Sequence, residues 1–178
     1  MNNILTYCNF RFPGQLSHYQ GKVREVYRLE GNILVLVASD RLSAFDVVMP
    51  EGIPYKGQIL NQIATQMMEA TADIVPNWLT ATPDPNVAIG KFCTPFKVEM
   101  VVRGYITGVT STSAWTAYEK GDRNFCGNEL PDGMRKNEKL PEPIITPSTK
   151  AAKGDHDESV SPSELYKRGV VDPALYKE

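Results

Sequence analysis

The sequence predicts a chain that combines β-strands with α-helices, and three segments carry this prediction. Residues 22–29 (KVREVYRL) alternate polar and apolar side chains, and residues 33–37 (ILVLV) form a continuous apolar run. A short turn with Gly31 and Asn32 separates the two, which indicates a β-hairpin whose second strand is buried. Residues 58–70 (QILNQIATQMMEA) then change to the spacing of an α-helix.

The other elements follow in order along the chain. The predicted helix at 58–70 carries apolar side chains on one face: Ile59, Ile63, Met67 and Ala70. Residues 83–86 (PDPN) indicate a loop, and residues 96–102 (FKVEMVV) alternate again as a strand that ends on Arg103-Gly104. A short helix is predicted over 113–120, and the glycine that follows ends it.

The last part of the chain combines proline-rich segments with two helix start signals. Residues 127–147 show little periodicity and are expected to form an ordered loop or hairpin. Residues 161–164 (SPSE) form a capping box, which predicts a helix that runs to about Arg168. Asp172-Pro173 repeats the signal, but the sequence stops within about one turn, and a helix that short is marginal alone. We therefore expect a truncated chain.

Composition limits the class of protein. The 178 residues carry 19 Lys and Arg and 21 Asp and Glu, a net charge of −2, which argues against a nucleic-acid or membrane-surface protein. The three cysteines are far apart, and the two histidines are too few for a histidine-rich metal centre. The longest apolar run, 33–38, is far shorter than the roughly 20 residues that span a bilayer. A cytoplasmic protein is predicted.

Two segments near the predicted hairpin could carry chemistry. Residues 21–24 (GKVR) combine a glycine, which allows close approach of a ligand to the backbone, with a lysine that neutralises phosphate. They do not form a P-loop, and the alternative is a pair of solvated charges on a strand. Residues 39–46 (SDRLSAFD) follow the buried strand. Asp40, Arg41 and Asp46 could hold a metal or orient a substrate, or they could form a turn with an ion pair.

Two later segments are also candidates. Arg103 leaves a strand and is followed by glycines and hydroxyl side chains up to Ser113, which suits a phosphate monoester; the alternative is a flexible Ser/Thr loop. Residues 146–158 contain TPSTK and GDHDE, in which His156 with its flanking acids could bind a metal or transfer a proton. A solvated charge run is the alternative there.

Together, these segments resemble one family. The stretches 21–27 (GKVREVY), 39–46 (SDRLSAFD), 98–108 (VEMVVRGYITG) and 141–158 (PEPIITPSTKAAKGDHDE) occur in the order and approximate spacing of SAICAR synthetases. The resemblance implies an α+β fold with a small antiparallel N-terminal lobe, on a plan similar to that of protein kinases, and the start of a larger α/β lobe. We place these lobes at 1–102 and 103–178, with ATP expected in the cleft between them.

The resemblance also implies roles for individual residues. ATP would be bound by Gly21, Lys22, Arg24 and the backbone near Glu99 and Met100. The residues expected to act on the reacting groups are Lys22, Asp40 and Arg41. The 5′-phosphate of the nucleotide substrate would be bound by Arg103 with Ser111 or Ser113, between which the sequence does not choose, because VTST separates TG from SAW. Further candidates are Asp46, Lys150, His156 and Asp157.

The implied activity is that of an ATP-dependent carbon–nitrogen ligase of purine biosynthesis. ATP with Mg²⁺ would phosphorylate the carboxylate of 4-carboxy-5-aminoimidazole ribotide, and L-aspartate would then displace the phosphate to give SAICAR. The later family motifs that should supply the metal-binding acids, D-x-K-x-E-F-G and D-E-V-x-T-P-D-S-S-R, are absent from the 178 residues. The fragment is therefore expected to be inactive alone, and a homo-oligomer is left open. The alternatives are a non-catalytic nucleotide-binding module and a purely structural domain.

Overall fold

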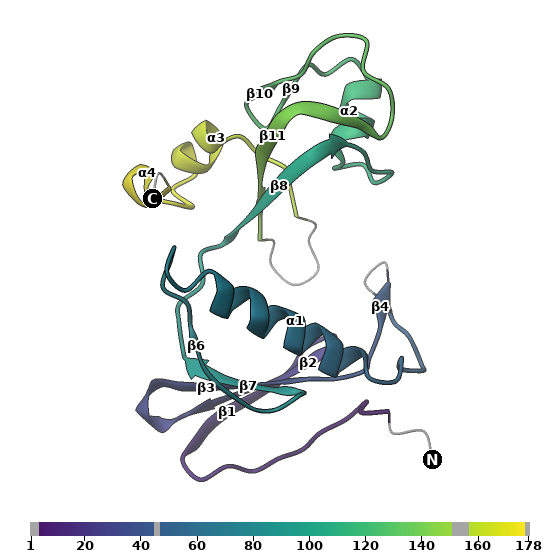
Figure 1. Ribbon diagram of the computed structural model, residues 1–178. Helices are drawn as coiled ribbons and strands as arrows, with labels where there is room; N and C mark the ends of the chain where they lie inside the picture. Colours follow the sequence, from purple (N-terminus) through teal and green to yellow (C-terminus); the bar gives the residue numbers. More distant parts are fainter. Residues whose placement is uncertain (1–3, 45–46, 151–156, 177–178) are drawn as a thin grey trace. The chain divides into compact units, whose positions relative to one another are not determined.

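The computed structural model describes residues 4–44, 47–150 and 157–176. It divides into two compact units, Met1–Thr94 (unit 1) and Pro95–Glu178 (unit 2) (Figure 1). The sequence predicted a boundary between residues 102 and 103, but that position lies inside a strand, β8 (Val98–Ile106). Among the described residues, no helix combines the length and the apolar content needed to cross a membrane.

Unit 1 is built on a five-stranded antiparallel sheet in the order β1-β2-β3-β7-β6. Its strands are β1 (Gln15–Gln20), β2 (Arg24–Leu29), β3 (Ile33–Ala38), β6 (Leu79–Asp84) and β7 (Val87–Lys91). The predicted hairpin is confirmed as β2 and β3, joined by the 3₁₀ turn η1 (Glu30–Asn32). Gly31 and Asn32 have positive φ angles of 72° and 62°, the conformation for which these residue types are suited.

The two faces of β3 bury different parts of unit 1. Val35 and Val37 point to one face, where they pack with Tyr27 of β2 and with Cys8 of the N-terminal segment. On the other face of the sheet lies the helix α1 (Lys56–Ala70), which contacts β3, β6 and β7 (Figure 1). A small pair of strands, β4 (Ser43–Ala44) and β5 (Val47–Val48), precedes this helix.

The helix α1 confirms the helix predicted at residues 58–70. The residues that it packs against the sheet are small ones, however, and not the predicted apolar face. Gly57 and Thr65 are its buried residues, whereas the predicted apolar face, including Ile59, Ile63 and Met67, is exposed. The reason is close approach, since a Cβ on Gly57 would lie 2.4 Å from the carbonyl oxygen of Ala38. Apolar spacing therefore predicted the helix without predicting which face packs on the sheet.

Unit 2 is built on the antiparallel pair of β8 and the long strand β11 (Glu138–Thr149). Its other elements are α2 (Ala114–Glu119), β9 (Asn124–Phe125), β10 (Asn128–Glu129), α3 (Pro162–Lys167) and α4 (Pro173–Tyr176). The predicted helices at 113–120 and 161–168 are thus confirmed. The core contains Ile106, Ala114, Tyr118, Phe125, Cys126, Leu130 and Leu140.

Strand β11 explains how a proline-rich segment enters a sheet. Only one described strand pairs with it along its length, and the pairing shifts between Lys139 and Ile144, the part that contains Pro141 and Pro143. Pro147 lies opposite Met100, and its carbonyl accepts the Val160 N–H (3.0 Å) instead of facing β8. A proline is tolerated where no ladder N–H is needed.

Candidate functional site

The turn 21–24 joins β1 to β2, and it is held by the segment that follows β3. The Gly21 N–H donates to the Arg24 carbonyl (2.8 Å), which closes the turn. Arg41 donates to two carbonyls of the turn and the Ser39 hydroxyl to a third. The acceptors are the carbonyl oxygens of Gly21 (3.0 Å), Lys22 (3.1 Å) and Val23 (2.8 Å). The first two predicted segments therefore form one hydrogen-bonded structure, with the Lys22 and Arg24 side chains exposed.

Arg41 is a buried cation that hydrogen-bonds to backbone and side-chain groups of unit 1. The residue is 7% exposed, and its Nη1 donates to Glu25 Oε1 (2.7 Å) and to the Thr6 carbonyl (2.6 Å). Glu25 is 0% exposed, and its second oxygen lies 2.8 Å from His18 Nε2, where a protonated Nε2 donates. A buried charge pair is tolerated only when its hydrogen-bonding groups are satisfied, and this cluster meets that condition.

Sequence reasoning missed Glu25 and His18 as part of the site. A signal for Glu25 did exist: strand alternation places it on the same face as Tyr27, which is completely buried. His18 carried no such signal, because β1 is largely exposed and its partner lies on another strand.

Asp40 joins the N-terminal segment to the helix α1. Its Oδ2 accepts the Leu5 N–H and its Oδ1 accepts the Gly57 N–H, both at 2.8 Å. Gly57 is the second residue of α1, whose N-cap residue Tyr55 has a φ of 64° and supplies no side-chain cap. Asp40, 3% exposed, therefore provides the acceptor and negative charge that a helix N-terminus requires. Asp46, the third candidate of this segment, lies outside the described residues.

In unit 2, β8 has one edge paired with β11 and one edge that no described strand covers. The Lys150 N–H donates to the Lys97 carbonyl, so every second residue from Lys97 turns its main chain toward β11. Glu99 belongs to this set, whereas the N–H and carbonyl of Met100 face the other edge. The Glu99 side chain forms an ion pair with Lys150, and this hydrogen bond raises the pKa of the Lys150 ammonium group.

Arg103 is oriented by a buried threonine. Its Nε donates to Thr146 Oγ1 (2.8 Å), and that hydroxyl donates to the Val101 carbonyl (3.0 Å). Because the contact uses Nε, it fixes the direction of the two terminal nitrogens of the guanidinium. Sequence reasoning noticed the TPSTK segment but gave Thr146 no role.

The two serines proposed for phosphate differ in their surroundings. Ser113 is buried and caps α2: its hydroxyl accepts the Thr116 N–H (3.4 Å) and donates to the Thr110 carbonyl (2.9 Å). Ser111 is exposed on the loop between β8 and α2. Gly108 is required beside Ser113, because its φ is 114° and a Cβ there would lie 2.3 Å from Ser113 Cβ.

The fourth predicted segment is described only in part. Lys150 and Asp157 are described, the latter exposed, whereas His156 lies outside the described residues. Within the described part of the chain, no three His, Cys, Asp or Glu side chains form a group that could hold a metal ion. The buried carboxylates of Glu25 and Asp40 are already hydrogen-bonded. These residues do not fit a Mg²⁺ site, and we derive no step through that ion.

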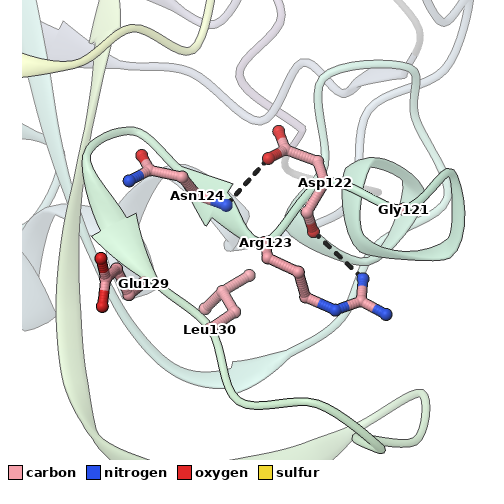
Figure 2. Close-up of a pocket in the computed structure, with 6 residues that line it drawn as sticks. All are labelled: Gly121, Asp122, Arg123, Asn124, Glu129 and Leu130. Atoms are coloured by element: carbon pink, nitrogen blue, oxygen red, sulfur yellow. Dashed lines mark hydrogen bonds between the residues drawn. The ribbon is translucent and has the colours of Figure 1, made fainter.

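A surface depression of about 400 Å³ in unit 2 contains none of the predicted site residues (Figure 2). It is lined by Gly121, Asp122, Arg123, Asn124, Glu129 and Leu130. The Arg123 guanidinium lies 3.8 Å from the centre of the Tyr118 ring and pairs with Asp132 (2.7 Å). Asp122 accepts the Asn124 N–H (2.8 Å). The polar groups that line this depression thus stabilise the turn between α2 and β9.

The structure is that of an α+β protein in which charged motifs follow the ends of antiparallel strands. Comparison with known proteins then identifies the family. The chain belongs to the SAICAR synthetase family, whose model matches residues 17–178. Both the α+β fold and the family resemblance expected from the sequence are thereby confirmed.

Individual relatives carry the same family name. The chain is 59% identical over 173 residues to the phosphoribosylaminoimidazole-succinocarboxamide synthase of Bacteroides thetaiotaomicron, a match that covers 97% of this chain and 54% of that protein. The chloroplastic synthase of Arabidopsis thaliana is 48% identical over 180 residues, covering 100% of this chain and 43% of the relative. The chain spans about half the length of the curated relatives it matches.

Solved structures agree. The Saccharomyces cerevisiae SAICAR synthase complexed with SAICAR superposes with a TM-score of 0.71 at 29% identity, covering 91% of this chain and 60% of that one. A second SAICAR synthase gives a TM-score of 0.75 at 28% identity, covering 92% and 57%. A type-2 SAICAR synthetase in complex with ADP, at 18% identity and a TM-score of 0.69, supports the fold alone; that match covers 90% of this chain and 61% of the other.

Proposed function

We propose that this chain forms the first part of an ATP-dependent ligase that joins L-aspartate to 4-carboxy-5-aminoimidazole ribotide, giving SAICAR, ADP and phosphate in purine biosynthesis. The observation that carries the proposal is the family match over residues 17–178, together with the 59% identity to the phosphoribosylaminoimidazole-succinocarboxamide synthase of B. thetaiotaomicron. Two arrangements in the structure support it: the turn 21–24, hydrogen-bonded to Arg41, and Arg103, oriented by Thr146.

In the proposed reaction, an oxygen of the substrate carboxylate attacks the γ-phosphorus of ATP, and ADP leaves. The aspartate amine then attacks the acyl carbon, loses a proton and expels phosphate. No covalent bond to the protein is needed, so the chain acts by positioning reactants and neutralising their charges. Lys22 is proposed to neutralise ATP phosphate oxygens, with Arg24 as a second cation. Gly21 would keep the turn accessible.

We assign Asp40 and Arg41 an indirect part in this chemistry. Their side chains hydrogen-bond to the N-terminal segment, α1 and the turn, so they support the shape of the site. This proposal differs from direct contact with the imidazole carboxylate, which the family resemblance implies. The two are separable by experiment, because an indirect role predicts a loss of stability together with a loss of activity.

Adenine is proposed to meet the uncovered edge of β8 at Met100. Adenine presents a hydrogen-bond acceptor at N1 and a donor at N6 on one side of the ring. A strand edge offers the matching pair, since the Met100 N–H donates and an edge carbonyl two residues away accepts. Glu99 is proposed to contribute through its ion pair with Lys150, which ties β8 to the end of β11.

The 5′-phosphate of the nucleotide substrate is proposed to bind Arg103 and Ser111. A guanidinium offers a planar fork of donors to a phosphate monoester, and a serine hydroxyl adds a single donor. Ser111 is preferred to Ser113, because the Ser113 hydroxyl already caps α2 and donates to a carbonyl. Roles for Asp46, His156 and Asp157, the use of Mg²⁺, a cytoplasmic location and a homo-oligomer stay predictions.

A chimaera tests the activity. Residues 1–178 would replace the matched first part of the B. thetaiotaomicron relative, and SAICAR formation would be measured with ATP, carboxyaminoimidazole ribotide and aspartate. We expect turnover close to that of the relative, and a drop of about 100-fold or more in kcat/KM for Lys22→Ala and Arg103→Ala. Matched surface substitutions, Lys120→Ala and Arg135→Ala, should leave it unchanged. A folded chimaera without turnover would contradict the proposal.

The 178-residue chain by itself separates the remaining alternatives. It is expected to show no turnover but to be stabilised thermally by ATP and by carboxyaminoimidazole ribotide. Stabilisation by ATP alone would favour a non-catalytic nucleotide-binding module. Stabilisation by neither ligand would favour a purely structural domain.

A further inference from the structure

His18, Glu25 and Arg41 form a cluster, in which Glu25 and Arg41 are buried and Arg41 hydrogen-bonds to the turn 21–24. We infer that Glu25 and His18 are positioning residues that act through Arg41 to hold this turn in the shape that binds phosphate. The inference rests on the proposed function for the phosphate, but the positioning itself is a property of the ligand-free chain.

The electrostatics of the cluster make Glu25 the residue on which Arg41 depends. Arg41 is a guanidinium with little access to water, so its charge needs a buried counter-charge. Glu25 supplies that charge at 2.7 Å and is itself completely buried. Without it, Arg41 must move toward solvent, and the bonds that its Nε and Nη2 make to the turn are lost.

Those two bonds set the orientation of the turn's peptide units. The carbonyls of Gly21 and Lys22 point at Arg41. Because a trans peptide places N–H opposite C=O, the amides of Lys22 and Val23 point away from the guanidinium. Backbone amides turned in a common direction form an anion-binding surface. Arg41 therefore controls the direction of the amide dipoles at the turn where ATP phosphates are proposed to lie.

His18 supports Glu25 from the other side. Its ring stacks on Tyr27 with centroids 4.5 Å apart and planes 11° apart, and Tyr27 donates its hydroxyl hydrogen to the Cys8 carbonyl (3.2 Å). This stack fixes the ring so that Nε2 meets Glu25 Oε2 at 2.8 Å. The imidazole is 27% exposed, so it is the member of the cluster that can be changed with least damage to the core.

Amide hydrogen exchange of the ligand-free 178-residue chain tests the positioning. The variants are Glu25→Gln, which removes the charge, and His18→Phe, which keeps a ring on Tyr27 but removes the bond to Glu25. We expect exchange at the turn 21–24 to accelerate about tenfold in the first and about threefold in the second. Exchange of the buried β3 amides serves as the fold check. Glu164→Gln, which disrupts an exposed ion pair in unit 2, is the matched control and should leave the turn unchanged.

A titration with ATP then links positioning to phosphate binding. The Kd for ATP is expected to rise about tenfold in Glu25→Gln, as for the loss of a charge-assisted contact, while Glu164→Gln keeps the original value. Unchanged turn exchange in both Glu25→Gln and His18→Phe would overturn the inference. Faster exchange with an unchanged Kd would overturn the link to phosphate.

Two further outcomes remain decisive. If Glu25→Gln loses protection in β3, the milder His18→Phe variant decides, because its ring stack is kept. If the unaltered chain does not bind ATP, the ATP site of the proposed function fails. The exchange data on the ligand-free turn still confirm or refute the positioning role of the cluster.

Discussion

Replacing Asp40 with alanine should destabilise unit 1 strongly, although the residue belongs to a motif that the sequence associates with chemistry. The carboxylate accepts one N–H from Leu5 and one from Gly57, each at 2.8 Å, and is almost completely buried. Alanine would leave both donors without this acceptor. It would also remove a negative charge from the N-terminus of α1, where the helix dipole is stabilised by an anion.

The magnitude follows from these contacts. A buried N–H that loses its partner costs about 1–3 kcal/mol, and loss of a helix N-cap costs about 0.5–2 kcal/mol. The Gly57 bond is counted in both figures, and partial relaxation lowers the sum, so we expect about 3–4 kcal/mol for Asp40→Ala. Asp40→Asn keeps one acceptor oxygen but turns an NH₂ group toward the other donor, so about 2 kcal/mol is expected.

Urea unfolding followed by tryptophan fluorescence measures this loss in unit 1 alone. The chain has two tryptophans, Trp78 in unit 1 and Trp115 in unit 2. In a Trp115→Phe background, the signal reports on the unit that contains Asp40. The matched control is Asp84→Asn, an exposed residue whose Oδ1 accepts the Asn86 N–H at 3.0 Å and whose amide replacement can do the same. Its effect should stay within about 0.5 kcal/mol.

A loss below about 1 kcal/mol in Asp40→Ala would refute the reasoning, because it would mean that neither N–H depends on the carboxylate. That result would favour the alternative in which the Asp40 carboxylate interacts directly with a substrate. A large loss in both Asp40→Ala and the Asp84→Asn control would show instead that unit 1 is sensitive to any change of charge, and the cap argument would fail.

Three further predictions follow from Gly108 and Cys126, both in unit 2. Gly108→Ala should cost about 2–4 kcal/mol in urea unfolding, since it adds a clash with Ser113 to the strain of positive φ; Gly121→Ala, with φ of 98° and open space around it, should cost only about 1–2 kcal/mol. Burial raises the pKa of the Cys126 thiol to about 11, so iodoacetamide at pH 8 should modify the exposed Cys93 first, as mass spectrometry of peptides would show. Because the unfolded thiol ionises near pH 9.0, before the folded one, the free energy of unfolding should fall between about pH 9 and pH 11 in a way that Cys126→Ala abolishes.

Much of the fold followed from local signals. Alternation and a Gly-Asn turn predicted β2 and β3, and the capping box that begins at Ser161 marked the start of α3. The extent of β11 was missed, because prolines normally argue against a strand. They are accepted here at an irregular register and where the main chain faces away from β8. The packing face of α1 was also missed, because it depends on how closely Gly57 approaches β3.

The sequence predicted several of the residues that the candidate site contains, but it did not predict their hydrogen-bond partners. The sequence singled out Lys22, Asp40, Arg41 and Arg103, and the structure joins the segments 21–24 and 39–41 directly. The partners of Asp40 and Arg41 lie 16 to 35 residues away, on segments that meet only after folding. An ion pair of Arg41 was one alternative left by the sequence, but such pairings leave no periodic trace, so Glu25 could not be identified as the partner.

The Ser39–Arg41 segment shows why a charged motif at a strand end need not contact a ligand to be essential to a site. Its three side chains fix the turn, the N-terminal segment and the start of α1. All three elements hydrogen-bond to this one short segment, so one misplaced charge there disturbs all of them. Substitutions there would abolish ligand binding through loss of shape, and substitutions at Lys22 would do so with the fold intact. Comparing stability with affinity at Arg41 and Lys22 therefore separates the residues that build this site from those that would use it.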